Sequence, residues 1–316
     1  MNAHPHPARY VPGRLTRPVG LRPLALLVAV AALAVTGAGQ IALAPPVAAI
    51  SSGDGLNNWW GFDTCGLQST SEMQYLWTNS LYEWNAVYIG GDEAEYVAHC
   101  SFPNASWLNT VESYGWNFVF IWDGLQAPNC NDTNAYAFST NPTTAEGQGQ
   151  LQAEDAWDTL VGPDGVSNDA LDSTLVDDLE GYEHYCTNYP YQSAVTAFIS
   201  GWDGYLKTGY PQTYGVYGSI CDSNLSAAAG ASPVPEFIWG ADYDSNPNPA
   251  IMADGPGGCG VPNGYWVNNQ RLKQYDQEVT SHGIVLDQDC ADGPTSPSGL
   301  WATNFESQCW YNTVQP

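Results

Sequence analysis

Two acids separated by a single residue, Asp178 and Glu180, follow the apolar start of the stretch TLVDDLEGYEHY at residues 174–185. Side chains two positions apart on a β-strand point to the same face, so these carboxyl groups are expected to lie close together. An ionised Asp178 would raise the pKa of Glu180, as a general acid requires. Glycosidic bond cleavage uses such a proton donor and a second carboxylate at the anomeric carbon. The spacing therefore predicts an acid pair suited to glycoside chemistry, with Asp177 facing the other way as a structural residue.

Other catalytic chemistries are poorly supported by the sequence. There is no G-x-S-x-G motif, beyond residue 49 the chain has three histidines, and no phosphate-binding G-x-x-x-x-G-K-[ST] loop occurs. The stretches DYDSNPN (242–248) and DQDCADG (287–293) resemble calcium loops, but Pro247 stands where such a loop needs glycine, and Ser298 where it needs glutamate. We expect no cofactor and no metal, although a less regular calcium site stays open as an alternative.

The N-terminal residues have the pattern of a secretory signal. Four arginines precede the apolar run Leu24–Val35, which is too short to span a bilayer stably. We expect residues 1–49 to be removed, with cleavage after Ala49 or, alternatively, after Ala38; an uncleaved N-terminal anchor is the competing interpretation. Residues 50–59 would then form a short linker, and the protein would be secreted, possibly associated with the cell wall, without a stable membrane span.

The charge beyond residue 49 is strongly negative. Only Lys207, Arg271 and Lys273 are basic there, whereas all 33 acidic residues of the chain lie in this part. Binding to nucleic acid or to anionic membranes needs clustered basic residues, so both partners are excluded. The composition fits a monomer that binds a neutral glycan or cell-wall polysaccharide, and it equally fits an acidic surface that serves solubility alone.

All eight cysteines lie beyond the expected signal, and an even number in an exported chain predicts disulfides. No C-x-x-C pair is present, which argues against a zinc ribbon. The sequence selects no pairing, and the simplest hypothesis joins neighbours along the chain. The candidate residues, in that order, are Cys65 with Cys100, Cys130 with Cys186, Cys221 with Cys259, and Cys290 with Cys309.

Short apolar runs alternate with longer amphipathic stretches, which predicts an α/β fold with parallel strands. We expect helices near 106–115, 143–160 and 192–208. The strand-like runs lie at 61–65, 86–91, 118–122, 174–178, 213–218, 237–241, 270–275 and 283–287. Eight strands with helical connections indicate a (β/α)8 TIM-type barrel with reduced helices late in the chain. The barrel domain would cover residues 60–291, and a C-terminal extension (292–316) would be tied back by a disulfide.

Acids stand at the ends of five of these strands, where such barrels carry their active sites. These are Asp63, Asp123, Asp178 with Glu180, Asp242 with Asp244, and Asp287 with Asp289. Aromatic side chains could supply stacking surfaces for sugar rings, although most of the thirteen Trp and nineteen Tyr are expected to fill the core. The best candidates for sugar contacts flank the acids: Trp59, Trp60 and Tyr182.

Several motifs occur together and in order: GFDTC (61–65), MQYLWTNSLYEWNAVYIGG (73–91), SWLNTVESYGWNFVFIWDGLQAP (106–128), DLEGY (178–182), FISGWDGYLKTGYPQTYGVYGS (198–219), FIWGADYD (237–244), QRLKQY (270–275) and GIVLDQD (283–289). With them the chain resembles the glycoside-hydrolase-like domain of secreted actinobacterial proteins, a family related to the muramidases of glycoside hydrolase family 25. The resemblance covers about residues 60–291.

The resemblance implies a (β/α)8-type barrel and assigns roles to particular residues. It implies Glu180 as the catalytic acid, with Asp178, Asp63 and Asp244 as further catalytic carboxylates. It implies that Gln126 and Asp289 bind substrate, whereas Asp123 stands where the family usually has a small or apolar residue. The function expected is hydrolysis of cell-wall or related polysaccharide; the alternatives are a non-catalytic glycan-binding barrel and a purely structural secreted protein.

Overall fold

The structure is a computed structural model that describes residues 60–129, 136–162, 165–166, 173–180, 189–208, 213–221, 223–252, 260–262, 264–266, 270–291 and Cys309. Contacts divide the chain into residues 1–44 and 45–316, and every described residue belongs to the second unit. The expected signal and linker therefore lie outside the described residues. Within the described ranges, no helix is both long and apolar enough to cross a membrane.

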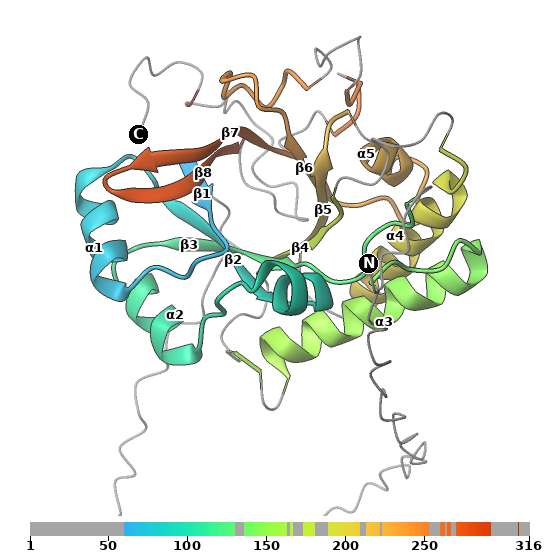
Figure 1. The fold of residues 1–316 in the computed structure, drawn as a ribbon, viewed down its shortest axis with the longest axis horizontal. Helices are drawn as coiled ribbons and strands as arrows, with labels where there is room; N and C mark the ends of the chain where they lie inside the picture. Colours follow the sequence, from blue (N-terminus) through green and yellow to red (C-terminus); the bar gives the residue numbers. More distant parts are fainter. Residues whose placement is uncertain are drawn as a thin grey trace, which may run out of the picture. The chain divides into compact units, whose positions relative to one another are not determined.

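Eight strands close into a barrel in which each strand pairs with its neighbours in chain order (Figure 1). Strands β1 to β7 are parallel, as predicted. The bounds are β1 Trp60–Asp63, β2 Trp84–Gly90, β3 Asn117–Trp122, β4 Thr174–Asp178, β5 Thr213–Ser219, β6 Phe237–Ala241, β7 Arg271–Ser281 and β8 Ile284–Ala291. The TIM-type barrel is confirmed, and each of the eight apolar runs contains or overlaps one strand.

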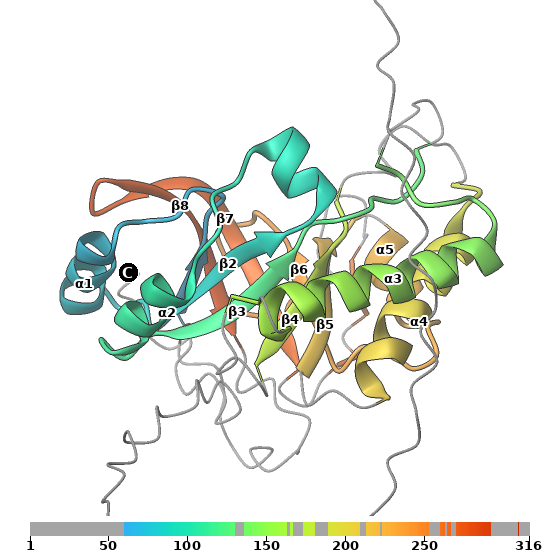
Figure 2. The ribbon, with the colours of Figure 1, turned by 90° about the horizontal axis from the view of Figure 1, so that it is seen from below.

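Helices follow most of the strands, and the long ones match the predicted segments. Figures 1 and 2 both show α3 and α4 lying side by side along one flank of the barrel. The bounds are α1 Thr70–Asn79, η2 Ala94–Ala98, α2 Ala105–Glu112, α3 Pro142–Val161, α4 Gln192–Lys207 and α5 Ser223–Ala228. Their starts are encoded locally, since Ser69 and Glu72 form a reciprocal capping box on α1 and Asn141 caps α3 ahead of Pro142.

The last strand differs from the prediction, because β8 runs antiparallel to both β7 and β1. Only His282 and Gly283 separate β7 from β8, whereas a parallel connection needs about a dozen residues or more. Both residues have positive φ angles, 52° and 85°, as a tight type I′ hairpin turn requires. The last strand therefore enters the barrel from the end where the other strands finish. We call that end the mouth, and the opposite end the foot.

Side chains alternate between the barrel interior and the helix layer. The interior is filled by large residues that include Trp84, Val176, Trp239 and Leu272. Gly61 belongs to this face, since a Cβ atom there would lie 2.0 Å from the Trp84 ring. The opposite strand faces pack under the helices in two further apolar clusters. This alternation decides which strand-end acids point inward.

Disulfides tie two loop segments to the barrel. Cys65 pairs with Cys100, and Cys290 of β8 pairs with Cys309, so the end of the chain is tied back as expected. The other two expected pairs each include a residue outside the described ranges, although Cys221 is disulfide-bonded. The sequential pairing is therefore confirmed for two of the predicted bridges and stays a prediction for the others.

Candidate active site

Three buried acids project from the mouth ends of β1, β3 and β4. Asp63, Asp123 and Asp178 each lie two positions beyond an interior-facing residue, Gly61, Ile121 and Val176 respectively, so their carboxyl groups continue the interior face. Glu180 lies two positions further along and is exposed. Its charge acts on all three acids. We call Asp63, Asp123, Asp178 and Glu180 the mouth cluster.

Burial sets the protonation of the three inner acids. Loss of hydration raises the pKa of Asp63 and of Asp123 to about 8, and it raises the pKa of Asp178 well above the usual range. Neighbouring carboxylates, Glu180 among them, add to each shift. The shift disfavours the ionised form of Asp178, and the tuning of Glu180 by an ionised Asp178 stays a prediction. A protonated Asp178 is a hydrogen-bond donor rather than an anion.

Gln126 braces the segment that carries the acid pair. Its side-chain Nε2 donates to Asp123 Oδ1 and to the carbonyl of Asp178, both at 2.8 Å, and its Oε1 accepts the backbone N–H of Glu180 at 2.8 Å. The loop carrying Gln126 is itself fixed, because its backbone exchanges hydrogen bonds with residues 136 and 138. With these contacts in place, Gln126 positions Asp178 and Glu180 relative to each other; a role in substrate binding stays a prediction.

Gln274 of β7 also holds side chains of the site in place by hydrogen bonds. Its Nε2 donates to Asp63 at 2.6 Å, while its Oε1 accepts the hydroxyls of Tyr217 at 2.7 Å and Tyr243 at 2.8 Å. Gln274 was not among the candidate residues from the sequence. The signal was present in QRLKQY, because Gln274 lies two positions after the interior residue Leu272. Through these hydrogen bonds Gln274 fixes the positions of the Asp63 carboxyl and of the two tyrosine hydroxyls.

Asp289 lies inside the barrel rather than after the last strand. Since β8 is antiparallel, Asp287 faces the end of β1, and Asp289 lies one inward step deeper, opposite Gly61. Its Oδ1 accepts the indole N–H of Trp239 at 3.0 Å. Burial, followed by the adjacent charge of Asp63, raises the pKa of Asp289 well above its usual range. Direct substrate contact by this fully buried group stays a prediction.

Asp244 does not join the mouth cluster. Its Oδ1 lies 2.9 Å from Nζ of Lys273, which also binds Asp242 at 2.8 Å. Lys273 occupies the outer face of β7, because it alternates with the interior residues Leu272 and Gln274. The backbone amides of residues 246, 248 and 250 occupy further oxygens of this calcium-like loop. The expectation that Asp244 joins the other acids at the mouth is therefore wrong. Its carboxylate forms an ion pair with Lys273 that anchors the loop.

The predicted aromatic contacts also need correction. Trp60 is buried in the outer core, edge-on to Tyr275 at 5.9 Å, so it faces away from the mouth. Trp59 and Tyr182 lie outside the described residues. Other aromatic residues reach the site instead, and strand alternation in AVYIGG and YGVYG could have found two of them: Tyr88, whose hydroxyl lies 3.5 Å from Asp178, and Tyr217. Tyr243, which is 48% exposed, is the accessible one.

Asp177 turns outward, as expected, but it is buried. It faces the helix layer with Asp203 of α4, and none of the four carboxyl oxygens of this pair has a hydrogen-bond partner among the described residues. Burial raises the pKa of both acids well above the usual range. The charge of Asp123 adds to the shift of Asp177, and the charges of Asp177 and Glu236 add to that of Asp203. Ionisation of either acid is disfavoured here, because an isolated buried carboxylate costs several kcal/mol.

A family model describing an Rv2525c-like, glycoside hydrolase-like domain matches residues 75–291, from α1 to the end of β8. The chain belongs to this family. The matched region includes Asp123, Gln126, Asp178, Glu180 and Asp289, while Asp63 lies just before it. Membership makes the domain glycoside hydrolase-like in kind. No curated protein matches the chain.

Two solved structures that match the chain have low sequence identity to it. One is the Tat-secreted protein Rv2525c of Mycobacterium tuberculosis, with 11% identity and a TM-score of 0.44, covering 74% of this chain and 95% of that one. Another is GHIP, a glycosyl hydrolase 25 of Streptococcus pneumoniae, with 12% identity and a TM-score of 0.41, covering 80% of this chain and 92% of that one.

Proposed function

We propose that the protein is a secreted glycoside hydrolase that cleaves glycosidic bonds in cell-wall or related polysaccharide at the mouth of its barrel. The observation that supports this most is the convergence of Asp63, Asp123 and Asp178 from three strands, all within electrostatic reach of the exposed Glu180. Carboxyl groups at the carboxyl ends of barrel strands are the groups this chemistry uses. Secretion is supported by the signal-like N-terminus and by the disulfides.

Glu180 is the member of the mouth cluster that is most accessible to a polymeric substrate. The other three members of the mouth cluster are buried, whereas its side chain is exposed and its backbone is held by Gln126. In the proposed step, the Glu180 carboxyl gives its proton to the glycosidic oxygen as the bond to the anomeric carbon breaks. A water molecule then adds to that carbon and returns a proton to the Glu180 carboxylate, so that hydrolysis is balanced.

The buried acids of the mouth cluster would assist this step by stabilising charge and by binding the substrate. Asp63 and Asp123 have pKa values of about 8, and loss of a proton from either one would let its carboxylate stabilise the positive charge that develops on the sugar ring. A protonated Asp178 would donate a hydrogen bond to a substrate oxygen, and Tyr243 would offer its exposed ring to a sugar face. The substrate is proposed to be a neutral glycan, because an anionic polymer would be repelled by the net charge of the chain, which is −26 for the whole sequence.

One observation favours a second candidate, a non-catalytic barrel that binds glycan at the same mouth. Glu180 is the exposed member of the cluster, while Asp63, Asp123 and Asp178 are each less than a tenth exposed. Hydrolysis requires a second carboxylate to reach the anomeric carbon. Inner acids that stayed out of reach of the sugar would leave a site that recognises glycan without cleaving it.

The experiment compares reducing-sugar release from cell-wall suspensions and neutral polysaccharides by the wild type and two variants. Glu180→Gln removes the proposed proton donor, so we expect turnover to fall by about 10²–10⁴-fold while the protein stays folded. Glu154→Gln is the matched control, because Glu154 is exposed on α3 and lies outside the mouth. Turnover by Glu180→Gln equal to that of the control would overturn the assignment. Saturable binding of wild type to glycan without any product would favour the second candidate.

A further inference from the structure

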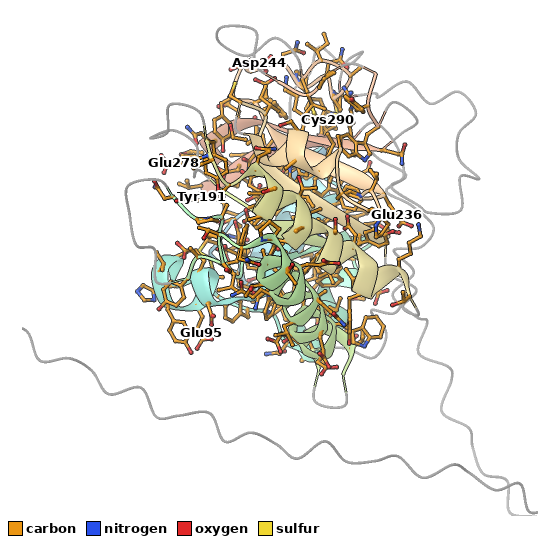
Figure 3. All side chains as sticks on the ribbon, turned by 90° about the vertical axis from the view of Figure 1, so that its right-hand side faces the viewer. Glu95, Tyr191, Glu236, Asp244, Glu278 and Cys290 are labelled. Carbon is orange, nitrogen blue, oxygen red and sulfur yellow. A yellow bond between two sulfur atoms is a disulfide. The ribbon has the colours of Figure 1, made fainter. Side chains whose placement is uncertain are left out.

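A cavity of about 480 Å³ opens at the foot of the barrel, away from the mouth cluster. Tyr214 is the second residue of β5, Glu236 directly precedes β6 and Gln270 directly precedes β7, so the cavity lies where these parallel strands begin. Figure 3 shows Glu236 on the opposite side of the barrel from Glu278, which lies in the hairpin beyond the mouth. The volume falls within the ~300–1,000 Å³ typical of small-molecule sites.

One wall of this foot pocket is an aromatic pair held by backbone contacts. Tyr265 and Trp266 line the pocket, with ring centroids 5.9 Å apart. The buried guanidinium of Arg271 donates from Nε to the carbonyl of Tyr265 at 3.0 Å and from Nη2 to the carbonyl of Pro262 at 3.0 Å. The indole N–H of Trp266 donates to the carbonyl of Pro235 at 2.9 Å. The pair is therefore fixed in place before any ligand arrives.

The lining of the pocket also carries polar groups. Glu236 is held through its backbone, whose N–H donates to the carbonyl of Tyr214 at 3.1 Å and whose carbonyl accepts Nε2 of Gln270 at 2.6 Å. Its Oε2 is buried and has no hydrogen-bond partner among the described residues. This oxygen is held in position and lacks a donor among the described residues, so the hydroxyl group of a ligand would donate a hydrogen bond to it.

The charges of the pocket nearly cancel. Of the three basic residues in the described ranges, Arg271 and Lys273 are buried, so Lys207 is the exposed one, and it lines this pocket. Its ammonium acts on Glu236, and burial raises the pKa of that carboxyl to about 7. In a chain that is otherwise strongly acidic, a near-neutral pocket favours an uncharged ligand.

We propose that the foot pocket is a second glycan-binding site, which holds one pyranose unit of a neutral polysaccharide. The Tyr265 ring, 48% exposed, would stack on the apolar face of the sugar. Glu236 Oε2 would accept a hydrogen bond from a sugar hydroxyl, and Lys207 would donate one. The inference goes beyond the proposed hydrolysis, because the pocket lies at the opposite end of the barrel and cannot contact a bond being cleaved at the mouth.

A second site would change how the protein acts on an insoluble polymer. A protein held at its foot keeps its mouth at high local concentration near other chains of the same polymer. Short soluble oligosaccharides would gain nothing from this attachment. The foot pocket is therefore expected to matter for binding to insoluble glycan and to leave the cleavage of short fragments unchanged.

The test measures binding isotherms of the full, oxidised protein on insoluble chitin, cellulose, curdlan and mannan. We expect the wild type to bind at least one of these, and Tyr265→Ala to lower that affinity at least tenfold. Tyr265→Phe keeps the ring and is expected to bind like the wild type, which separates loss of stacking from loss of fold. Tyr75→Ala is the matched control, since Tyr75 is similarly exposed on α1. Glu236→Gln, which keeps the shape but weakens the acceptor, should also weaken binding.

The outcome for the foot pocket is separable from the outcome for the mouth. Turnover by Glu180→Gln reports on the mouth alone, and binding by Tyr265→Ala reports on the foot pocket alone. Absence of wild-type binding to every polymer would overturn the proposal. Wild-type affinity in Tyr265→Ala would also overturn it. If only the mouth variant Tyr243→Ala lost affinity for the polymer, all glycan binding would be assigned to the mouth.

Discussion

At the scale of single residues, Asp63 and Asp289 show how a barrel interior can hold several acids without strong repulsion. Asp63 accepts a hydrogen bond from Gln274, Asp289 accepts one from the Trp239 indole, and burial raises the pKa of both carboxyl groups. The raised pKa of each group means that the folded protein keeps a proton on it at a pH where the unfolded chain has released that proton. The pair therefore stabilises the fold at acidic pH and loses that contribution as the pH rises.

Replacing Asp289 by asparagine should remove this dependence. An amide keeps the acceptor for Trp239 and can still donate to Asp63, but it never ionises. The free energy of unfolding of Asp289→Asn should therefore rise relative to the wild type between pH 5 and pH 8, by up to about 1.4 kcal/mol per pH unit. Urea unfolding at both pH values measures this difference. Asp158→Asn, on the exposed surface of α3, is the control and should show no such difference from the wild type. If the stability of Asp289→Asn depended on pH as that of the wild type does, the raised pKa of Asp289 would be contradicted.

Residue-level prediction succeeded where strand alternation decides direction. Asp63, Asp178 and Glu180 were placed at the mouth because a strand end and a two-residue spacing fix the side of the sheet. Asp244 and Trp60 were misplaced for different reasons. Asp244 lies beyond its strand in a loop, where its direction is set by Lys273, a partner 29 residues away that no local pattern reveals. Trp60 lies on the strand but alternates outward, which a count from Asp63 already indicates.

At the scale of elements, the contact between α3 and α4 depends on two glycines. A Cβ atom on Gly149 of α3 would lie 2.0 Å from the carbonyl oxygen of Phe198, and one on Gly201 of α4 would lie 2.0 Å from that of Glu146. Each helix thus lies directly against the backbone of the other. Gly147, two residues before Gly149, faces open space instead. Two glycines on one helix therefore have opposite structural roles.

Alanine at these two positions should change stability in opposite directions. Gly147→Ala should stabilise the protein by about 0.5–1 kcal/mol, because alanine loses less backbone entropy in a helix. Gly149→Ala should destabilise it by about 1–3 kcal/mol, because the helices must move apart. Thermal unfolding of the two variants beside the wild type measures both effects. Similar shifts for the two variants would contradict the close backbone contact.

The elements of the fold were largely predictable, with the exception of the last strand. Seven strands and the three long helices follow from apolar runs, helical spacing and local capping signals. The reversal of β8 was missed because its apolar run looks like that of a parallel strand. The decisive signal was the gap between the last two apolar runs, residues 276–282, which is too short for any parallel connection. That reversal is what brings Asp289 into the interior from the mouth end.

At the scale of the whole molecule, buried acids outnumber buried bases, and this sets the pH dependence of stability. Burial raises the pKa of nine carboxyl groups in the described ranges, while hydrogen bonds lower that of Glu72 alone. The nine groups are Asp63, Glu83, Asp123, Asp177, Asp178, Asp203, Glu236, Asp287 and Asp289. In each, the folded state binds a proton that the unfolded state releases near pH 4, so stability falls as the pH rises above that value.

We therefore expect the melting temperature to be highest near pH 4–5 and to fall steadily towards pH 8. Asp63 and Asp123, with pKa values of about 8, extend the decline to the upper end of this range. Calorimetric scans at constant ionic strength between pH 4 and pH 8.5 provide the measurement. A melting temperature that rose with pH would show that these carboxyls are ionised in the folded protein.

The central claim is that Glu180 is the proton donor for glycosidic bond cleavage, and the dependence on the leaving group tests it most directly. A dinitrophenyl glycoside of the sugar that the wild type releases needs no protonation, because dinitrophenolate leaves unaided. Glu180→Gln should then lose about 10²–10⁴-fold in rate on the natural glycan but less than about 10-fold on the dinitrophenyl glycoside. Equal losses on both substrates, or no loss on the glycan, would contradict the assignment of Glu180 as the acid.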